Sequence, residues 1–264
     1  MKIKLNNVSE TMLITLYMRA TDAKSEKSIL NDKKSEEIIS QIDYDFSKFK
    51  HAWASYYGVL SRAKMMDNEV KKFMKKYPDC VIVSIGCGLD TRFLRIDNGK
   101  IKWYNLDLPE VIEKRKLFFE PNERVIDIAK SAFDSAWTKD IKLEGKKLLI
   151  ISEGVLMYFE EQQIKQFLEI LTDNFDSFEA QFDLLYKGTV KMSKKHDTLK
   201  NMEAKFSWGV KDGSEIVKLN PKLKQTGLIN FTDEMKHHLP GWKKLFIPFF
   251  YIFNNRLGIY TYEK

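Results

Sequence analysis

The chain has 264 residues, of which 44% are hydrophobic and 13% aromatic; this is enough apolar material for one sizeable domain and excludes an intrinsically disordered chain. The formal net charge is +7. Because the lysines and arginines alternate with acids, as in residues 24–27 and 113–116, they are typical of solvated helix faces, and we expect no nucleic-acid partner.

Residues 1–76 are predicted to form a helical cap. Apolar residues recur there at helical spacing, as in residues 12–17. A helix should end before Tyr77, because Pro78 disfavours helical conformation in the residue that precedes it. Residues 1–20 lack the apolar core and cleavage site of a signal peptide, which favours a cytoplasmic location.

A buried strand is predicted over residues 81–85, a short run of mostly β-branched residues. The strand leads into Gly86-Cys87-Gly88, where missing side chains allow a sharp turn and let a ligand approach the backbone. The two cysteines, Cys80 and Cys87, fit neither a zinc spacing nor a disulfide framework. We therefore expect no metal site and a reducing compartment.

A second strand is predicted over residues 101–106 and ends at Asp107, nineteen residues after Gly88. A strand, a glycine turn and an acid about 20 residues later form a nucleotide-cradle pattern, in which the acid accepts hydrogen bonds from ribose hydroxyls. Thr91 stands where a dinucleotide site has its third glycine, so a pyrophosphate would be poorly held. We therefore expect a nucleoside ligand without phosphates, of which S-adenosylmethionine is the common one. An ordinary tight turn in an α/β domain is the alternative.

The middle of the chain alternates strands with helices. A helix is expected from Pro109, followed by strands over residues 124–129 and 147–152, a helix over 160–174 and a strand over 178–185. The run at 147–152 is almost wholly apolar, as expected for a strand that helices cover on both faces. Residues 77–185 are therefore predicted to be a cofactor-binding core, built as an α/β, Rossmann-like, doubly wound and mostly parallel sheet.

Residues 186–230 are polar and weakly periodic but contain Phe206 and Trp208. We expect them to form a lid over the crevice at the carboxyl ends of the strands; a surface excursion without a role is the alternative. In residues 231–264, two apolar runs flank an Asn/Gly turn, which predicts an antiparallel hairpin. The longest apolar run, residues 245–253, is far too short to span a membrane, and no membrane partner is expected.

Three blocks of sequence resemble the leucine carboxyl methyltransferase family: GCGLDTR at residues 86–92, WYNLDLPEVIEKRK at 103–116 and SEGVLMYF at 152–159. They occur in the family's order and spacing, and the likeness extends to residues 9–20 and 206–215. The family includes polyketide-type O-methyltransferases, which are class I enzymes. The resemblance implies one methyltransferase domain that spans the chain, with S-adenosylmethionine as cofactor and S-adenosylhomocysteine as product.

Position and resemblance together predict the residues that hold the nucleoside. Gly86, Cys87 and Gly88 form the turn beside the cofactor, and Asp107 with Leu108 lies at the ribose. The alternative for Asp107 is an acid that stabilises the first turn of the following helix through the helix dipole.

Arg62 and Glu153 are expected at the methionine end of the cofactor. In the family, an arginine at the place of Arg62 grips the methionine carboxylate, a task that suits the guanidinium fork. The glutamate that matches Glu153 lies close to the methionine part. A solvent-facing arginine and an ion pair within the core are the alternatives. The resemblance further implies that Arg92 braces the loop through Asp90.

Two registers compete for the adenine edge. The family has an Asp-Leu pair after the third strand, and either Asp127-Ile128 or Ser131-Ala132 takes its place here. The second register better matches the distance to Trp137, and we prefer it. Ser131 then replaces the family's acid.

Tyr158 and His196 are the candidate catalytic residues. Tyr158 lies just past Glu153, where it could hydrogen-bond an acceptor oxygen, and His196 is the histidine best placed to act as a base. A carboxylate acceptor is ionised at pH 7 and needs no base. We expect O-methylation of a hydroxyl or carboxylate on an anionic or aromatic small molecule. The alternatives are methylation of a protein C-terminal carboxylate, S-adenosylmethionine binding without catalysis, and a nicotinamide dehydrogenase.

Overall fold

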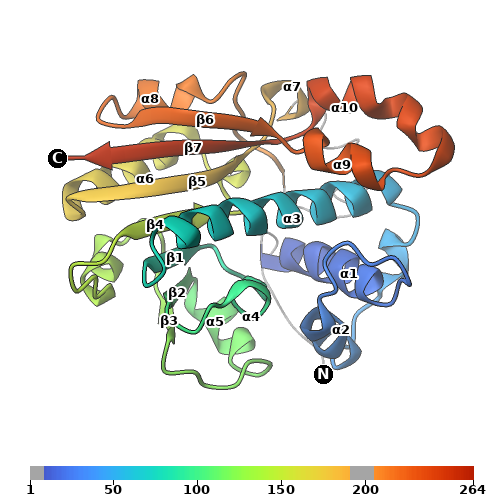
Figure 1. Cartoon of the computed structure of the whole chain (residues 1–264), viewed down its shortest axis with the longest axis horizontal. Coiled ribbons are helices and arrows are strands. Elements are labelled where there is room, and N and C mark those ends of the chain that lie inside the picture. Colours follow the sequence, from blue (N-terminus) through green and yellow to red (C-terminus); the bar gives the residue numbers. More distant parts are fainter. Residues whose placement is uncertain (1–8, 191–204) are drawn as a thin grey trace.

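The computed structural model describes residues 9–190 and 205–264. Within these ranges the centre is a seven-stranded sheet of order β3-β2-β1-β4-β5-β7-β6 (Figure 1). The strands are β1 Val81–Ile85, β2 Lys102–Asp107, β3 Val125–Ala129, β4 Leu148–Ser152, β5 Ser177–Leu184, β6 Lys224–Asn230 and β7 Arg256–Glu263. β1 to β5 run parallel, and β7 lies antiparallel between β5 and β6. The predicted doubly wound, mostly parallel sheet is confirmed.

Helices cover both faces of this sheet. The α-helices are α1 Met12–Ala23, α2 Lys33–Ser40, α3 Trp53–Lys76, α4 Arg92–Ile96, α5 Pro109–Arg115, α6 Glu161–Asn174, α7 Lys187–Val190, α8 Ser214–Leu219, α9 Thr232–His238 and α10 Ile247–Phe253. Short 3₁₀ helices include η2 Phe46–Phe49, η3 Ser135–Asp140, η4 Leu156–Tyr158 and η7 Gly241–Phe246.

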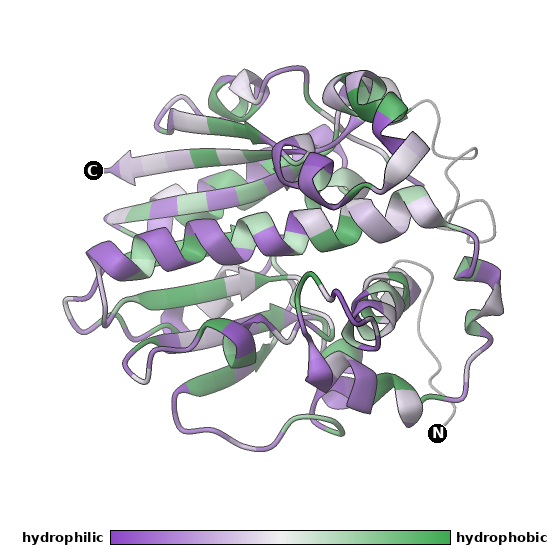
Figure 2. Ribbon diagram, turned by 45° about the vertical axis from the view of Figure 1, so that its right-hand side comes forward, coloured by the Kyte–Doolittle hydropathy of each residue, from purple (hydrophilic) through white to green (hydrophobic). Residues whose placement is uncertain are grey.

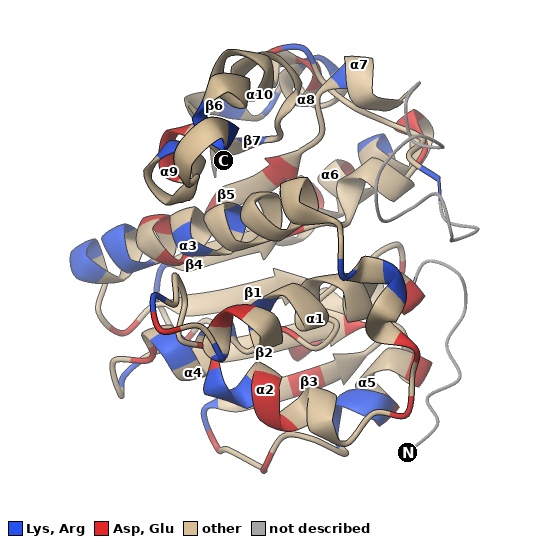
Figure 3. Ribbon diagram, turned by 90° about the vertical axis from the view of Figure 1, so that its right-hand side faces the viewer, with Lys and Arg blue, Asp and Glu red and all other residues tan. Residues whose placement is uncertain are grey.

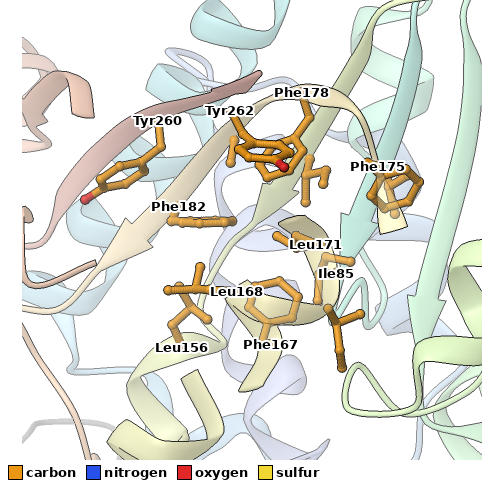
Figure 4. Close-up of a cluster of buried hydrophobic side chains, with 14 of the residues drawn as sticks. Ile85, Leu156, Phe167, Leu168, Leu171, Phe175, Phe178, Phe182, Tyr260 and Tyr262 are labelled. Atoms are coloured by element: carbon orange, nitrogen blue, oxygen red, sulfur yellow. The ribbon is translucent and has the colours of Figure 1, made fainter. Parts of the chain in front are cut away.

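Alternate residues of each strand supply the two halves of the core, because successive side chains of a strand point to opposite faces. Val81 and Val83 pack with the apolar faces of α6 and α8 in one cluster, part of which is drawn in Figure 4. Ile82 packs with residues of α3 and α4 in the other. The sheet is therefore buried on both sides, and its ligand site has to lie at an end of the strands.

Proline residues and a capping interaction set the boundaries of the helices that surround the sheet. Pro109 begins α5, where its fixed φ suits the first turn. Glu160 precedes α6 and forms a capping box with Gln163, whose side chain accepts from the Glu160 backbone N–H at 2.8 Å. α3 ends at Lys76, directly before Tyr77-Pro78, as the sequence predicts.

The helices predicted for the N-terminal region are present. α1 and α2 pack on each other, and α1 also packs on α3 (Figure 1). Asp32 begins α2 by accepting from the Ser35 backbone N–H at 3.1 Å. Tyr17 of α1 stacks on Phe46 of η2, with ring centroids 5.5 Å apart. These contacts hold the cap beside the carboxyl ends of the strands.

The antiparallel pair at the end of the sheet is present, but its first strand is not the one predicted. β7 pairs with β6, residues 224–230, whereas residues 247–253 form α10. The run at 245–253 is apolar throughout, so its pattern does not separate strand from helix. Pro248 favours the helix because it lies in the first turn, where a proline is tolerated.

The region predicted as a lid, residues 186–230, divides into parts with different surroundings. Trp208 is buried in the core cluster, so it is not the exposed aromatic that the lid prediction requires. Residues 224–230 are the edge strand β6. Phe206 alone of these aromatics lines the cavity described below. The remainder, residues 191–204, lies outside the described residues.

Candidate active site

A cavity of about 700 Å³ opens at the carboxyl ends of the parallel strands. It lies beside β1 and β4, where the strand order reverses, which is the usual ligand crevice of a doubly wound sheet. Residues that follow four of the strands line the cavity. Gly86, Leu108 and Glu153 directly follow β1, β2 and β4, and Ser131 lies just beyond the end of β3. The cavity volume suits a molecule of nucleoside-cofactor size.

The glycine turn after β1 has the conformation and the crowding that require glycine. Gly86 has φ +64° and Gly88 φ +48°, which side-chain-bearing residues rarely adopt. A Cβ at position 86 would collide with the side chain of Val155, and one at position 88 would lie 3.2 Å from Cβ of Met12. Cys87 between them is a free thiol, and burial raises its pKa well above the ordinary value, so it stays neutral.

Asp107 ends β2 and ties this turn in place. Its Oδ2 accepts from the Gly88 backbone N–H at 2.7 Å, and its Oδ1 accepts from the Leu108 backbone N–H at 2.8 Å. Burial raises the pKa of the carboxyl group, although both backbone donors work against that shift. Each oxygen has a second lone pair, so the group can still accept from the hydroxyls of a ligand in the cavity.

Arg62 and Glu153 meet at the wall of the cavity. Nε of Arg62 donates to Oε1 of Glu153 at 2.9 Å, and Nη1 donates to Oδ2 of Asp183 at 3.0 Å. Burial alone raises the pKa of Glu153, but the guanidinium groups of Arg62 and Arg92 hold it below its usual value. Burial raises the pKa of Asp183, which lies fully inside the protein. Arg62 is therefore a largely enclosed, paired side chain on the cavity wall and not a solvent-facing one.

Behind the glycine turn lies a network of buried ion pairs. Arg92 bridges Asp67 at 2.7 Å, Asp90 at 2.9 Å and Glu153. Arg19 of α1 reaches Asp90 at 3.1 Å and the Leu89 carbonyl at 2.9 Å. Burial alone raises the pKa of Asp90, but the arginines around it hold the pKa far below its usual value. The predicted role of Arg92 as a brace through Asp90 is observed.

The two registers for the adenine edge differ in their surroundings. Ser131 and Ala132 line the cavity. Asp127 instead lies within β3, where its Oδ1 accepts from Asn105 at 2.9 Å and pairs with Arg115 at 3.5 Å. The geometry therefore favours the register that places Ser131 beside the cavity.

The sequence that builds this site is similar to that of known proteins. Residues 12–172 match the model of the leucine carboxyl methyltransferase family. The tetracenomycin polyketide synthesis O-methyltransferase of Streptomyces glaucescens is 30% identical over 209 residues, which cover 79% of this chain and 77% of that protein. An S-adenosyl-L-methionine-dependent methyltransferase of Gibberella zeae is 27% identical over 247 residues, with 84% and 82% covered. A candidate methyltransferase from Thermobifida fusca has the same fold, with a TM-score of 0.61 at 12% identity and 94% of both chains covered.

The chain belongs to the leucine carboxyl methyltransferase family. The resemblance predicted from its three sequence blocks is confirmed, and with it the class of S-adenosylmethionine-dependent methyltransferases. The matched residues 12–172 run from the start of α1 to the last turn of α6 and include the whole glycine turn.

Aromatic side chains form the outer wall of this family member's cavity. Tyr158 of η4 and Phe206 pack together with ring centroids 5.7 Å apart, and both line the cavity. Burial raises the pKa of Tyr158, so its hydroxyl is protonated at neutral pH. Trp53 at the start of α3 and Phe249, Phe250 and Phe253 of α10 also belong to this wall.

Sequence reasoning missed two parts of the site. One is Asp183, an acid near the end of β5. The sequence places it at the end of a strand, as it places Asp107 at the end of β2, and this position is the signal that could have identified it. The α10 aromatics lie in a run that was predicted to be a strand. His196 lies outside the described residues. Among the residues that the structure does describe, no cluster of His, Cys, Asp or Glu is arranged to hold a metal ion.

Within residues 9–190 and 205–264, none of the helices combines the length and the apolarity needed to cross a bilayer.

Proposed function

We propose that this protein transfers a methyl group from S-adenosylmethionine to an oxygen atom of a small-molecule acceptor. The observation that carries the proposal is the turn at Gly86–Gly88, which Asp107 holds at the edge of the cavity. A turn without side chains, followed by a carboxylate at the end of the next strand, suits a nucleoside. Membership in a methyltransferase family indicates that this nucleoside is S-adenosylmethionine.

The residues of the cavity fit S-adenosylmethionine from end to end. Gly86, Cys87 and Gly88 leave room for the nucleoside against the backbone, and the acceptor lone pairs of Asp107 suit the ribose hydroxyls. Ser131 and Ala132, which line the cavity beyond β3, would hold the adenine edge.

At the other end of the cavity, charged groups suit the amino-acid part of the cofactor. The guanidinium of Arg62 suits the methionine carboxylate, and the carboxylate of Glu153 suits its ammonium group. S-adenosylmethionine supplies a methyl group on a positively charged sulfur. The protein's own contribution is to hold donor and acceptor in line and to keep water out of the cavity.

Tyr158 orients the acceptor in this proposal. Its hydroxyl is protonated at neutral pH, because burial raises its pKa, so it can donate a hydrogen bond to an acceptor oxygen but is not a general base. The aromatic wall of Trp53, Phe206, Phe249 and Phe250 would pack on a flat apolar acceptor. The similarity to a polyketide O-methyltransferase supports a small aromatic acceptor of this kind.

Hydroxyl and carboxylate acceptors are both consistent with oxygen methylation. The family's own description is a carboxyl methyltransferase, which favours a carboxylate, including a protein C-terminal one. A carboxylate needs no base, which matches a protonated Tyr158. The relative from Streptomyces glaucescens favours the small-molecule acceptor.

Methyl-labelled S-adenosylmethionine distinguishes these functions. The protein is incubated with a panel of phenols, small carboxylic acids and peptides with a free C-terminus, and each labelled product is treated with mild base. A methyl ester releases its label, whereas a methyl ether keeps it. We expect a labelled small molecule. Labelling of the peptides alone would establish protein carboxyl methylation, and tight S-adenosylhomocysteine binding without any product would establish a non-catalytic binder.

A further inference from the structure

Residues 241–253, which form η7 and α10, lie at the edge of the molecule and consist mostly of hydrophobic residues (Figure 2). Trp242 is 63% exposed, Leu245 81%, Phe249 47% and Ile252 52%, and neither helix contains a buried residue. A single exposed apolar residue is ordinary, but large ones gathered over consecutive turns mark a binding surface. We call residues 241–253 the η7–α10 surface.

Positive charge accompanies this surface. Lys243 and Lys244 lie within it, and no Asp or Glu stands between Glu234 and Glu263 in the sequence. The ammonium group of Lys243 lies 5.0 Å from the centroid of the Trp53 ring, so its charge sits directly among the aromatic side chains. α10 itself carries no charged residue (Figure 3). The η7–α10 surface is therefore apolar with a basic border.

The nearest acids, on the neighbouring α9, are engaged with partners of their own. Asp233 accepts from the Tyr251 hydroxyl at 2.7 Å and lies 3.6 Å from the ammonium group of Lys236. Glu234 lies 2.7 Å from the ring nitrogen of His238. These contacts hold both acids on α9, and the lysines of η7 remain the charged side chains within the η7–α10 surface itself.

The η7–α10 surface is continuous with the mouth of the cavity. Phe249 and Phe250 of α10 belong to this surface and also line the cavity. Trp53, another wall residue, packs against Trp242 and Phe246 with ring centroids 6.2 Å and 5.7 Å away. Whatever covers the surface would therefore lie next to the opening of the site.

We infer that the η7–α10 surface docks the protein onto an anionic phospholipid bilayer, with its apolar side chains at the acyl boundary and Lys243 and Lys244 among the headgroups. Trp, Phe and Leu beside lysines are the composition of helices that lie in a membrane interface without crossing it. A second copy of the chain fits less well, because a two-fold contact through this surface would bring the same lysines toward one another. The inference replaces the expectation, from the sequence alone, that a membrane is not a partner.

Sedimentation with vesicles tests the inference. The purified chain is mixed with vesicles of phosphatidylcholine alone, or of phosphatidylcholine with phosphatidylglycerol, at low and high salt. We expect binding to the anionic vesicles that weakens as salt rises. Leu245→Ser should weaken binding about tenfold or more, and Lys244→Glu should weaken it by a similar factor.

Matched control variants lie on other exposed positions. Leu94→Ser removes a leucine that is 55% exposed on α4, and Lys100→Glu reverses an exposed lysine far along the chain. Both should bind vesicles as the wild type does. All variants should keep wild-type affinity for S-adenosylhomocysteine, because Leu245, Lys244, Leu94 and Lys100 do not line the cavity. That measurement also shows that each variant is folded.

The fluorescence of Trp242 identifies the surface that makes contact. Trp103, Trp137 and Trp208 are buried, so a vesicle-induced blue shift should come from Trp242 and from the half-buried Trp53 that packs against it, and the part due to Trp242 should be lost in Trp242→Phe. Equal sedimentation of the wild type, the surface variants and the controls would overturn the inference. So would a wild-type dimer that Leu245→Ser converts to a monomer, or a Trp242 emission that is already blue-shifted and unaffected by vesicles, since each means that protein covers the surface.

Discussion

Replacement of Arg62 by lysine tests whether this side chain holds the methionine carboxylate of the cofactor. The guanidinium donates from Nε to Glu153 at 2.9 Å and from Nη1 to Asp183 at 3.0 Å, and only 12% of the side chain is exposed. Lysine keeps the positive charge that these two buried acids need, but it lacks the planar fork that binds a carboxylate through two parallel bonds. Loss of one charge-assisted hydrogen bond costs about 1.5–3 kcal/mol, or roughly 10- to 100-fold in Kd.

The assay is calorimetry with two ligands. S-adenosylhomocysteine carries the methionine carboxylate, whereas adenosine lacks the whole amino-acid part. Arg62→Lys should therefore weaken S-adenosylhomocysteine by the factor above and leave adenosine affinity unchanged. Equal losses for the two ligands, in a variant whose thermal unfolding matches the wild type, would refute the contact.

Arg62→Ala serves as the control for structural damage. It leaves the carboxylates of Glu153 and Asp183 buried without their shared partner, and breaking a buried pair in this way costs about 3–5 kcal/mol of stability. We expect a clearly lower melting temperature and weaker binding of both ligands. The contrast between the lysine and alanine variants separates ligand recognition from folding.

Three further predictions concern other parts of the site. Asp107→Ala should weaken S-adenosylhomocysteine and adenosine alike by about 1.5–3 kcal/mol in calorimetry, because both ligands contain the ribose; wild-type affinity for either would show that Asp107 only braces Gly88. Tyr158→Phe should leave S-adenosylhomocysteine affinity unchanged and lower kcat about tenfold with the acceptor found by methyl labelling, since it removes only a hydroxyl; an unchanged kcat would mean that Tyr158 only packs against its neighbours. The pKa values of Asp90 and Glu153 are lowered in the folded state, so the stability they contribute is fully present above their ordinary pKa values of 3.8 and 4.5 and is lost as pH falls below them. Urea unfolding should show this loss begin at about pH 5 and continue below pH 3, because the folded-state pKa of Asp90 lies far below its ordinary value, and Asp90→Asn should flatten it; an unchanged slope would remove Asp90 as a contributor.

The parallel core was predictable because its central strands, β1 and β4, are short apolar runs with clear limits. Residues 147–152 show this best, since an almost wholly apolar strand fits only a sheet covered on both faces. The glycine turn and Asp107 were predictable for a different reason. Their spacing along the chain is fixed by the length of one strand–helix–strand unit, so sequence distance reports spatial proximity.

The opposite end of the sheet was not predictable from local pattern. Residues 224–230, KQTGLIN, form β6 although they are mostly polar, because an edge strand packs on one side only. Residues 247–253 are apolar throughout and form a helix, and a run without alternation or helical spacing does not distinguish a strand from a helix. Without the position of α10, the aromatic wall of the cavity could not be placed either.

The buried ion pairs explain why the N-terminal helices are part of the site and not an independent unit. Arg19 on α1 and Asp67 on α3 both reach the loop that carries Asp90 and Arg92, and Arg92 continues to Glu153 after β4. Burying charges is costly unless every one is paired, so each element depends on the others to keep its partner. Removal of the cap would take away Arg62 and Asp67, so Asp183 would lose its ion-pair partner and Arg92 would lose one of its carboxylates, and the turn would lose the position that the cofactor requires. Helices and sheet therefore form one cooperative unit around the cavity, and the contacts of Arg19 and Asp67 are the part that the sequence did not predict.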